Sequence, residues 1–338
     1  LVFKTEGELQ RKGIPFQAEY PGNPVVPGES PATGLPWEGV YAPVLLVLDN
    51  AQDAHPHWGV GDADILYQVP NAGAGATKLL ALFSDKAPSD AGGSRSSRTP
   101  FVDVARGWGA AFAYAGSPGD SVSDKASVPL KLREAGMRRN ILSFDLLGSN
   151  DYSRRISGYA SPHNLSADIA RIRELALRNG AVFTPKPFLF TDVLPEGYPP
   201  VSRIEIRHYG ETADAGDGNP ASFSAFTYDA SSNAWHRENA AGPYVDRDTP
   251  DAPVPFANVI VQRVKFSYSN PYIQLDHLVG TGAADIFIGG SYIKGGWQRE
   301  SLDDRTVFVD ENGRELSLLR GKTFIILTND VTRVTVTP

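Results

Sequence analysis

Apolar residues in the first half of the chain form short continuous runs rather than an alternating pattern. The run at 44–48 is apolar throughout and is followed directly by Asp49 and Asn50. A run of this kind, closed by polar residues, is typical of a strand that is buried on both faces of a sheet. Three further strands are predicted at 64–69, 77–83 and 110–116. The pattern of the second of these also fits a helix.

Two helices are predicted from capping residues and from apolar residues spaced three or four apart. The first begins near Pro100, which fits the first turn of a helix, with Ser97 or Thr99 as its cap. The second spans 166–179 and is capped by Asn164 or by its own first residue. Both helices carry one apolar face, so we expect them to pack against a sheet.

From residue 201 onward, apolar and polar residues alternate, which predicts strands with one buried face. Strands are predicted at 257–268, 284–288, 306–309, 315–319 and 323–328. The pair Asn312-Gly313 predicts a hairpin, because both residues tolerate a positive φ. The patterns together predict a mixed α+β (α/β) protein with a layered mixed-sheet N-terminal part and a β-rich C-terminal part.

Three regions follow from this reading of the chain. Residues 1–39 are rich in proline and glycine and predict an extended tether, because proline fixes φ and removes a hydrogen-bond donor. Residues 40–190 predict a mixed α/β domain, and residues 191–338 predict a β-rich domain packed on the first. The boundary is expected in the proline-rich connection at 185–200.

Composition limits the classes of function. The 338 residues carry a formal net charge of −7, which argues against nucleic acid as a partner, since a phosphate backbone selects basic surfaces. The absence of cysteine excludes disulfides, thiolate nucleophiles and sulfur-ligated zinc. No apolar run approaches the roughly 20 residues that cross a bilayer. Because the chain begins with Leu1, we expect a processed or trimmed protein whose N-terminal membrane anchor is absent from this chain.

Two stretches approach known motifs without meeting their physical requirements. Residues 115–119, AGSPG, approach the nucleophile elbow G-x-S-x-G, but Pro118 follows Ser117 and has no N–H to stabilise an oxyanion. Residues 73–78, GAGATK, supply two glycines of a dinucleotide-binding fingerprint and then a lysine in place of the third. Both stretches predict turns next to strands.

Imidazole and carboxylate groups gather between residues 49 and 64, where His55 and His57 lie among several aspartates. These groups could hold zinc, but their spacing matches no known ligand pattern. A rigid exposed turn is the favoured interpretation, and neither a metal nor another cofactor is predicted. His208 and His236 lie in strand-like contexts and predict structural roles.

The stretch 92–101, GGSRSSRTPF, is the strongest candidate for a binding loop. Arg95 and Arg98 directly precede the predicted helix near Pro100. Two guanidinium forks and the N–H groups of a helix N-terminus could therefore converge on one anion. The alternative is that both arginines pair with acidic residues or face water, and spacing alone slightly favours this alternative.

Several stretches together resemble the YerB-like lipoproteins, a bacterial family whose function is not established. The stretches fall in the same order as in the family and run from about residue 35 to residue 328. The matching stretches are 48–50, 63–67, 95–98, 161–165, 257–262, 280–282, 295–297 and 321–323. Each stretch alone is unspecific, and the ordered series carries the resemblance.

The resemblance implies a two-part α/β architecture and an extracytoplasmic position at the bacterial cell membrane, held there by a lipid anchor. It also implies that eight polar residues match family positions and form either a ligand site or a structural arginine network. These residues are Asp49, Asn50, Asp64, Arg95, Ser96, Arg98, His163 and Asn164. The chain departs from the family at Gln68 and Ala72, where glutamate is usual, and at Lys78, where arginine is usual. If those glutamates transfer protons in relatives, this chain has lost that chemistry.

These observations favour a non-catalytic envelope protein that binds an anionic cell-wall or lipid-linked ligand, or an envelope partner protein. The alternative is a hydrolase or transferase that acts on a cell-wall polymer or a phosphate ester. In that case the arginines would stabilise negative charge, and His163 or Asp49 would move protons. A third possibility is that an apolar or β-edge surface captures a protein partner. The sequence does not decide between a binding protein and an enzyme.

Overall fold

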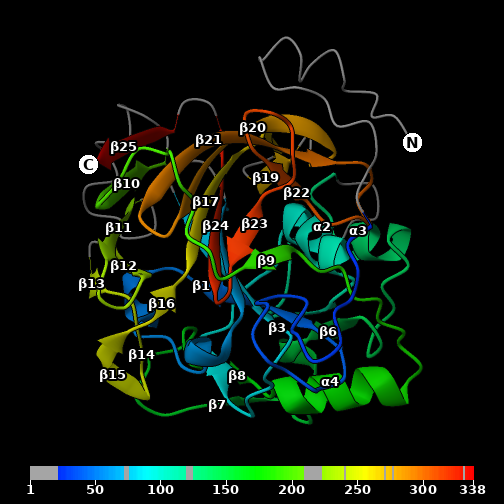
Figure 1. The fold of residues 1–338 in the computed structure, drawn as a ribbon. Helices are drawn as coiled ribbons and strands as arrows, with labels where there is room; N and C mark the ends of the chain where they lie inside the picture. Colours follow the sequence, from blue (N-terminus) through cyan, green and yellow to red (C-terminus); the bar gives the residue numbers. More distant parts are fainter. Residues whose placement is uncertain are drawn as a thin grey trace.

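The computed structural model describes residues 22–71, 76–118, 125–208, 223–239, 241–269, 272–275, 278–329 and 332–338. Within these residues the fold is mixed α and β with many strands and few helices, which confirms the predicted fold class. Figure 1 shows a large central sheet, a smaller sheet beside it on the left, and helices on the right.

The central sheet has ten strands in the described part of the chain, and both halves of the sequence contribute to it. In spatial order the strands are β22 (Val307–Val309), β21 (Ser291–Arg299), β20 (Gly280–Ile288), β17 (Asn258–Arg263), β24 (Thr323–Thr328), β2 (Ile65–Pro70), β3 (Thr77–Phe83), β1 (Val44–Asp49), β5 (Ala111–Tyr114) and β6 (Ser143–Asp145). Strands β17, β24 and β2 are parallel to one another, as are β1, β5 and β6, and β3 runs antiparallel between the two groups. All six residues of β1 are buried, so the predicted buried strand at 44–48 is confirmed.

A second sheet and several short strand pairs surround the central sheet. The second sheet contains β13 (Gly242–Pro243), β12 (Ala234–Asn239), β11 (Phe223–Asp229), β10 (Arg203–Arg207) and β25 (Arg333–Thr337), and β16 (Pro255–Phe256) pairs with β12. The short groups are β14 (Val245–Asp246) with β15 (Thr249–Pro253), β18 (Phe266–Ser269) with β19 (Tyr272–Leu275), β23 (Ser317–Leu319) with β9 (Leu189–Thr191), and β4 (Ala91–Gly92) with β8 (Leu165–Ala167) and β7 (Ser153–Arg155).

Three α-helices lie in the described part of the chain: α2 (Thr99–Trp108), α3 (Val128–Glu134) and α4 (Ile169–Arg178). The single-turn 3-10 helices are η1 (Gln52–Ala54), η2 (Val60–Asp62) and η3 (Leu146–Gly148). The first predicted helix is confirmed as α2, and Gly109 ends it in the left-handed conformation with φ 60°. Its predicted cap is wrong, because Arg98 occupies the N-cap position and makes no side-chain capping bond.

The second predicted helix is confirmed as α4, but it begins three residues later than expected. Leu165–Ala167 form strand β8 instead, because they pair with β4 on one side and β7 on the other. The cap is Asp168, whose carboxylate accepts a hydrogen bond of 2.8 Å from the amide of Arg171. The predicted caps Asn164 and Ser166 are therefore wrong. A capping pattern is local and does not show which distant segments pair as strands.

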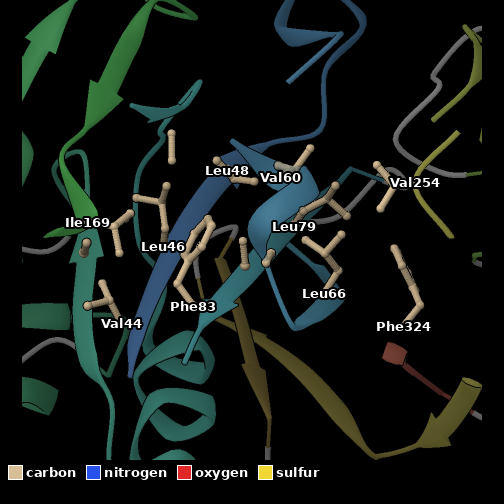
Figure 2. Close-up of a cluster of buried hydrophobic side chains, with 14 of the residues drawn as sticks. Val44, Leu46, Leu48, Val60, Leu66, Leu79, Phe83, Ile169, Val254 and Phe324 are labelled. Carbon is tan, nitrogen blue, oxygen red and sulfur yellow. The ribbon is translucent and has the colours of Figure 1, made fainter. Parts of the chain in front are cut away.

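The central sheet is covered on both faces. Figure 2 shows part of the first buried cluster, in which apolar residues of β1, β2 and β3 meet Ile169 of α4 and Phe324 of β24. The second sheet joins the same cluster through Phe226, whose ring lies 5.0 Å from that of Phe324. Alternate residues of β1, including Leu45 and Val47, face the opposite side and pack with α2 and α3. Burial on both faces explains why these strands are continuously apolar.

The segment at 22–39 approaches the central sheet next to Asp85, which follows β3. Ser30 Oγ and Thr33 Oγ1 donate to the two carboxylate oxygens of Asp85 at 2.5 and 2.8 Å. The indole of Trp37 donates to the carbonyl of Asp85 at 3.1 Å. Residues 30–34 are all buried, so this stretch packs on the fold rather than extending from it. Residues 1–21 of the predicted tether lie outside the described residues.

The predicted domain boundary at 185–200 falls between strands that join one continuous sheet. Strands β1, β2, β3, β5 and β6 precede the boundary, whereas β17, β20, β21, β22 and β24 follow it. Both ranges, 40–190 and 191–338, contribute strands to the central sheet. The division of the chain into two domains at this boundary stays a prediction.

Candidate functional site

The loop at 92–98 lies against the C-terminal end of β1. The amide of Asp49 donates to the carbonyl of Gly93 at 2.9 Å, and the amide of Arg95 donates to the carbonyl of Val47 at 3.1 Å. This backbone pairing places the side chain of Arg95 beside Asp49, the last residue of β1. Strands β1 and β5 are parallel, and ligands bind in open α/β sheets at such carboxyl ends.

The carboxylate of Asp49 joins three basic side chains. Lys78 Nζ lies 2.5 Å from Oδ1, while Arg95 Nε and His163 Nδ1 lie 2.7 and 3.0 Å from Oδ2. The amide of Ala51 also donates to Oδ1, at 3.2 Å. Only 3 % of the Asp49 side chain is exposed. We call Asp49, Lys78, Arg95 and His163 the Asp49 cluster.

The Asp49 cluster carries more positive than negative charge. Burial acts to raise the pKa of Asp49, but Lys78 and Arg95 more than offset it, so the pKa lies below its usual range and the carboxylate is ionised. Burial lowers the pKa of Lys78, although Asp49 opposes this effect. One carboxylate therefore faces an ammonium and a guanidinium, with an imidazole as a third basic neighbour.

The two arginines of the loop have different surroundings. Arg95 uses Nε to bind Asp49, and one third of its side chain, 33 %, is exposed. Its two terminal nitrogens form no hydrogen bond with any residue in the described ranges. Arg98 donates from Nη1 to the carbonyl of Ser97 at 2.6 Å. It occupies the N-cap position of α2 without a side-chain capping bond. Both guanidinium groups lie near enough to Lys78 to lower its pKa further. Ser96, which lies between the two arginines in sequence, is half-buried.

Asn50 is fully buried and turns toward the interior rather than toward Arg95. Its amide nitrogen donates to Thr77 Oγ1 at 2.9 Å, and its side-chain oxygen lies 3.2 Å from His55 Nε2. Asn164 accepts a hydrogen bond of 2.6 Å from Arg155 Nη1 and does not face Asp49. The side chains of these two predicted site residues thus bind residues outside the Asp49 cluster.

Asp64 lies far from the Asp49 cluster. It precedes β2, whereas Asp49 ends β1, and the intervening β3 is antiparallel to both strands. Asp64 is therefore at the opposite edge of the sheet, on the order of 20 Å away, the length of a six-residue strand. Its carboxylate accepts hydrogen bonds from the amides of Ser84 and Asp85 at 2.6 and 2.9 Å. Asp49 and Asp64 both lie in stretches that match the family, and the sequence does not show that they lie at opposite ends of the strands.

The predicted exposed turn at His55 and His57 is wrong. His57 is fully buried, with Nε2 at 2.5 Å from the carbonyl oxygen of Asp49 and Nδ1 at 3.2 Å from the hydroxyl of Tyr244. Burial lowers the pKa of His57 to about 4 and that of His55 to about 2. Both rings are neutral at pH 7; His57 lies in the interior, whereas His55 is half-buried. Across the ranges that the structure describes, no group of three acidic or histidine side chains is placed to hold a metal ion.

A chain of buried polar groups continues from the Asp49 cluster into the space between the two sheets. Asn50 binds Thr77, which accepts a hydrogen bond of 3.2 Å from Gln68, and Gln68 accepts one of 2.6 Å from Ser224 of β11. Arg237 of β12 donates to Ser224 at 3.0 Å. In the sequence, Gln68 and Lys78 stand out only as departures from the family, and nothing marks Arg237, because its strand alternates normally.

Comparison with known proteins agrees with this fold. The N-terminal domain of the protein of unknown function DUF3048 matches residues 32–182, and the C-terminal domain of DUF3048 matches residues 217–325. The chain belongs to this family. The match covers both halves of the central sheet and includes every residue of the Asp49 cluster. This match, together with a solved structure of a YerB protein, confirms the resemblance to the YerB-like proteins.

The crystal structure of the YerB protein from Bacillus subtilis has the same fold. It aligns with a TM-score of 0.74 and 24 % sequence identity, over 91 % of this chain and 99 % of that one. No match was found among the curated proteins. None of the helices in the described ranges is long and apolar enough to cross a membrane.

Proposed function

We propose that this protein binds an anionic ligand of the bacterial cell envelope at the Asp49 cluster and does not transform it. The observation that carries the proposal is the excess of basic groups around one buried carboxylate. Lys78 and Arg95 both bind Asp49, and the exposed third of Arg95 is available to a second anion. A guanidinium fork matches the geometry of a phosphate or carboxylate.

The contacts of Arg95 favour binding because they hold the side chain in place before a ligand arrives. Its backbone pairs with Val47 and Ala115, at the ends of β1 and β5, and its Nε pairs with Asp49. A side chain that is already ordered loses less conformational entropy when it binds. The position at the carboxyl end of parallel strands supports the same interpretation.

The cellular location is part of the proposal. The YerB-like resemblance supports an extracytoplasmic domain that an N-terminal lipid anchor holds at the membrane. In that location the abundant anions are cell-wall polymers and lipid-linked precursors, which bear phosphate or carboxylate groups. We therefore propose a wall or lipid-linked anion as the ligand, and an envelope partner protein would have to present an acidic group to the same site.

Calorimetric titration with a glycerol-phosphate oligomer and with a muropeptide tests the proposal. We expect Arg95→Ala to weaken binding at least about tenfold, the effect of losing one charge-assisted contact. Arg178→Ala is the matched control, because Arg178 is an exposed arginine near the end of α4. Equal binding by Arg95→Ala and the parent protein, or no binding of either probe by the parent, would refute the proposal.

One observation favours a second candidate, a hydrolase or transferase that acts on such polymers or on phosphate esters. Asp49 holds Nδ1 of His163, which leaves Nε2 for proton transfer to a substrate. Asp49 itself would orient the ring, because its low pKa keeps it ionised. Turnover of muropeptides or aryl phosphates by the parent protein, lost in His163→Gln with ligand binding retained, would establish this candidate in place of simple binding.

A further inference from the structure

Arg237 is one of the largest fully buried side chains of the protein, with 1 % of its surface exposed. It projects from β12 into the space between the second sheet and the central sheet. Its Nε and Nη2 donate to Ser224 Oγ at 3.3 and 3.0 Å, and Nη2 also lies 3.4 Å from Gln68 Oε1. Its guanidinium lies over the rings of Tyr244 and Phe324, at 4.8 and 5.3 Å. We call these five residues the Arg237 site.

In the described part of the chain, the hydrogen bonds and ring contacts of Arg237 are all with neutral groups. No carboxylate in the described part of the chain forms an ion pair with it, and Nη1 is buried without a hydrogen-bond partner. Burial lowers the pKa of Arg237 to about 10, so the guanidinium is still charged at pH 7. A buried charge without an opposite charge is costly, and buried charges in proteins are almost always paired.

His208 lies close enough to Arg237 to feel its charge, and it does not neutralise that charge. Burial, and then the positive charge of Arg237, lower the pKa of His208 to about 4. Neither ring nitrogen of His208 has a hydrogen-bond partner, and only 1 % of the residue is exposed. A neutral imidazole carries one N–H, so His208 is a second buried donor in the same region. The surroundings therefore combine donors and positive charge.

We propose that a small monovalent anion of the halide class binds at Arg237 Nη1, between the two sheets. The anion supplies the charge that the Ser224 hydroxyl, the Gln68 amide and the two aromatic rings cannot supply. Its role is to stabilise the packing of β12 on the central sheet. This site is separate from the Asp49 cluster and does not depend on the proposed function, because Arg237 is enclosed and cannot meet a wall polymer.

Two substitutions remove the need for the anion in different ways. Arg237→Met replaces the charge with an apolar chain that suits the aromatic rings. Gln68→Glu instead places a carboxylate beside Arg237 Nη2 and retains the oxygen that accepts from Ser224. Both variants should lose the response to halide, and Gln68→Glu should also be more stable than the parent protein when halide is absent.

The experiment is a thermal unfolding titration with sodium bromide, held at constant ionic strength with sodium sulfate. We expect the Tm of the parent protein to rise with the logarithm of the bromide concentration above the dissociation constant, by roughly 4 °C at a hundredfold excess. Arg95→Ala, which alters only the Asp49 cluster, should keep this rise. A crystal grown with bromide should show the ion within hydrogen-bond distance of Nη1.

Three results would overturn the inference. The first is a parent protein whose Tm does not respond to bromide more than to sulfate. The second is a response that Gln68→Glu retains in full, a result that decides the matter even if Arg237→Met does not fold. The third is a response that Arg95→Ala abolishes, because that would place the ion at the Asp49 cluster instead.

Discussion

Asp49 and Lys78 lie directly opposite each other in the antiparallel pairing of β1 and β3, and their side chains form a buried ion pair of 2.5 Å. Arg95 and His163 reach the same carboxylate from two other segments. A single anion thus holds together three parts of the chain that are far apart in sequence. The cluster should depend more on the carboxylate than on any one of its basic partners.

We predict that Asp49→Asn lowers the free energy of unfolding by about 3–5 kcal/mol, because it leaves buried basic groups without an opposite charge. Urea denaturation of the parent and the variant measures the difference. Lys78→Met is the matched control and should cost less, since Arg95 still pairs with Asp49. A larger loss in Lys78→Met than in Asp49→Asn would contradict this account of the cluster.

Asp64 should make stability depend on pH in the opposite sense to Asp49. Burial, and then the neighbouring carboxylate of Asp85, raise the pKa of Asp64 to about 7. An unfolded aspartate has a pKa near about 4, so the folded state binds the proton more tightly. The stabilising contribution is therefore complete below about pH 4 and is lost as the pH rises through about 7.

Asp64→Asn removes this pH dependence while keeping an oxygen for the amides of Ser84 and Asp85. The free energy of unfolding should fall less steeply between about pH 4 and pH 7 in the variant than in the parent protein. Urea denaturation at several pH values measures the slope. Asp151→Asn, at an exposed aspartate, serves as the control and should keep the slope of the parent. An unaltered slope in Asp64→Asn would show that Asp64 titrates normally.

Gly93 is required where the loop at 92–98 passes the segment of His163. A Cβ at this position would lie 2.1 Å from the carbonyl oxygen of His163, and rotation of a side chain cannot relieve a clash with backbone. We predict that Gly93→Ala lowers the free energy of unfolding by about 1–3 kcal/mol, the usual cost of overpacking. It should also shift the NMR signals of the His163 imidazole, because that ring is held against Asp49.

Gly148→Ala provides the comparison for this substitution. An added carbon there meets only the end of the Arg139 side chain, at 3.0 Å, and a flexible arginine can move away. This control should change the Tm little and leave the His163 signals in place. Equal effects of the two substitutions would mean that the close approach at Gly93 has no special importance.

The parts of the fold that sequence predicts are those with local causes. The apolar run at 44–48 identifies β1, because burial on both faces requires apolar residues at every position. Pro100 and Gly109 identify α2, because one suits its first turn and the other ends it with a positive φ. Asp49 and Arg95 are likewise identified by their places at the end of a strand and before a helix.

The parts that sequence does not predict depend on contacts between distant segments. Lys78 joins the cluster through the register of β1 and β3, which no local pattern specifies. Asp64 and Asp49 look equivalent in sequence, and only the strand directions place them at opposite edges. Arg237 follows the alternation of an ordinary strand, and it is buried because the second sheet, to which β12 belongs, packs on the central sheet.

The last prediction concerns the segment at 30–37, which Asp85 holds against the central sheet. Asp85→Ala leaves the hydroxyls of Ser30 and Thr33 without their acceptor, and each buried donor left unpaired costs about 1–3 kcal/mol. The segment should therefore detach more often while the strands stay folded. Limited digestion with a glutamate-specific protease, followed by mass spectrometry, should show faster cleavage at Glu29 and Glu38.

Asp192→Ala is the control for this experiment, because Asp192 is an exposed partner of Arg320, which also binds Glu29. Losing this surface contact should leave the cleavage rate close to that of the parent protein, since exposed ion pairs contribute little. If Asp85→Ala is cut no faster than Asp192→Ala, the carboxylate of Asp85 does not hold the segment. Attachment would then rest on the burial of Ala32 and its neighbours, which neither substitution alters.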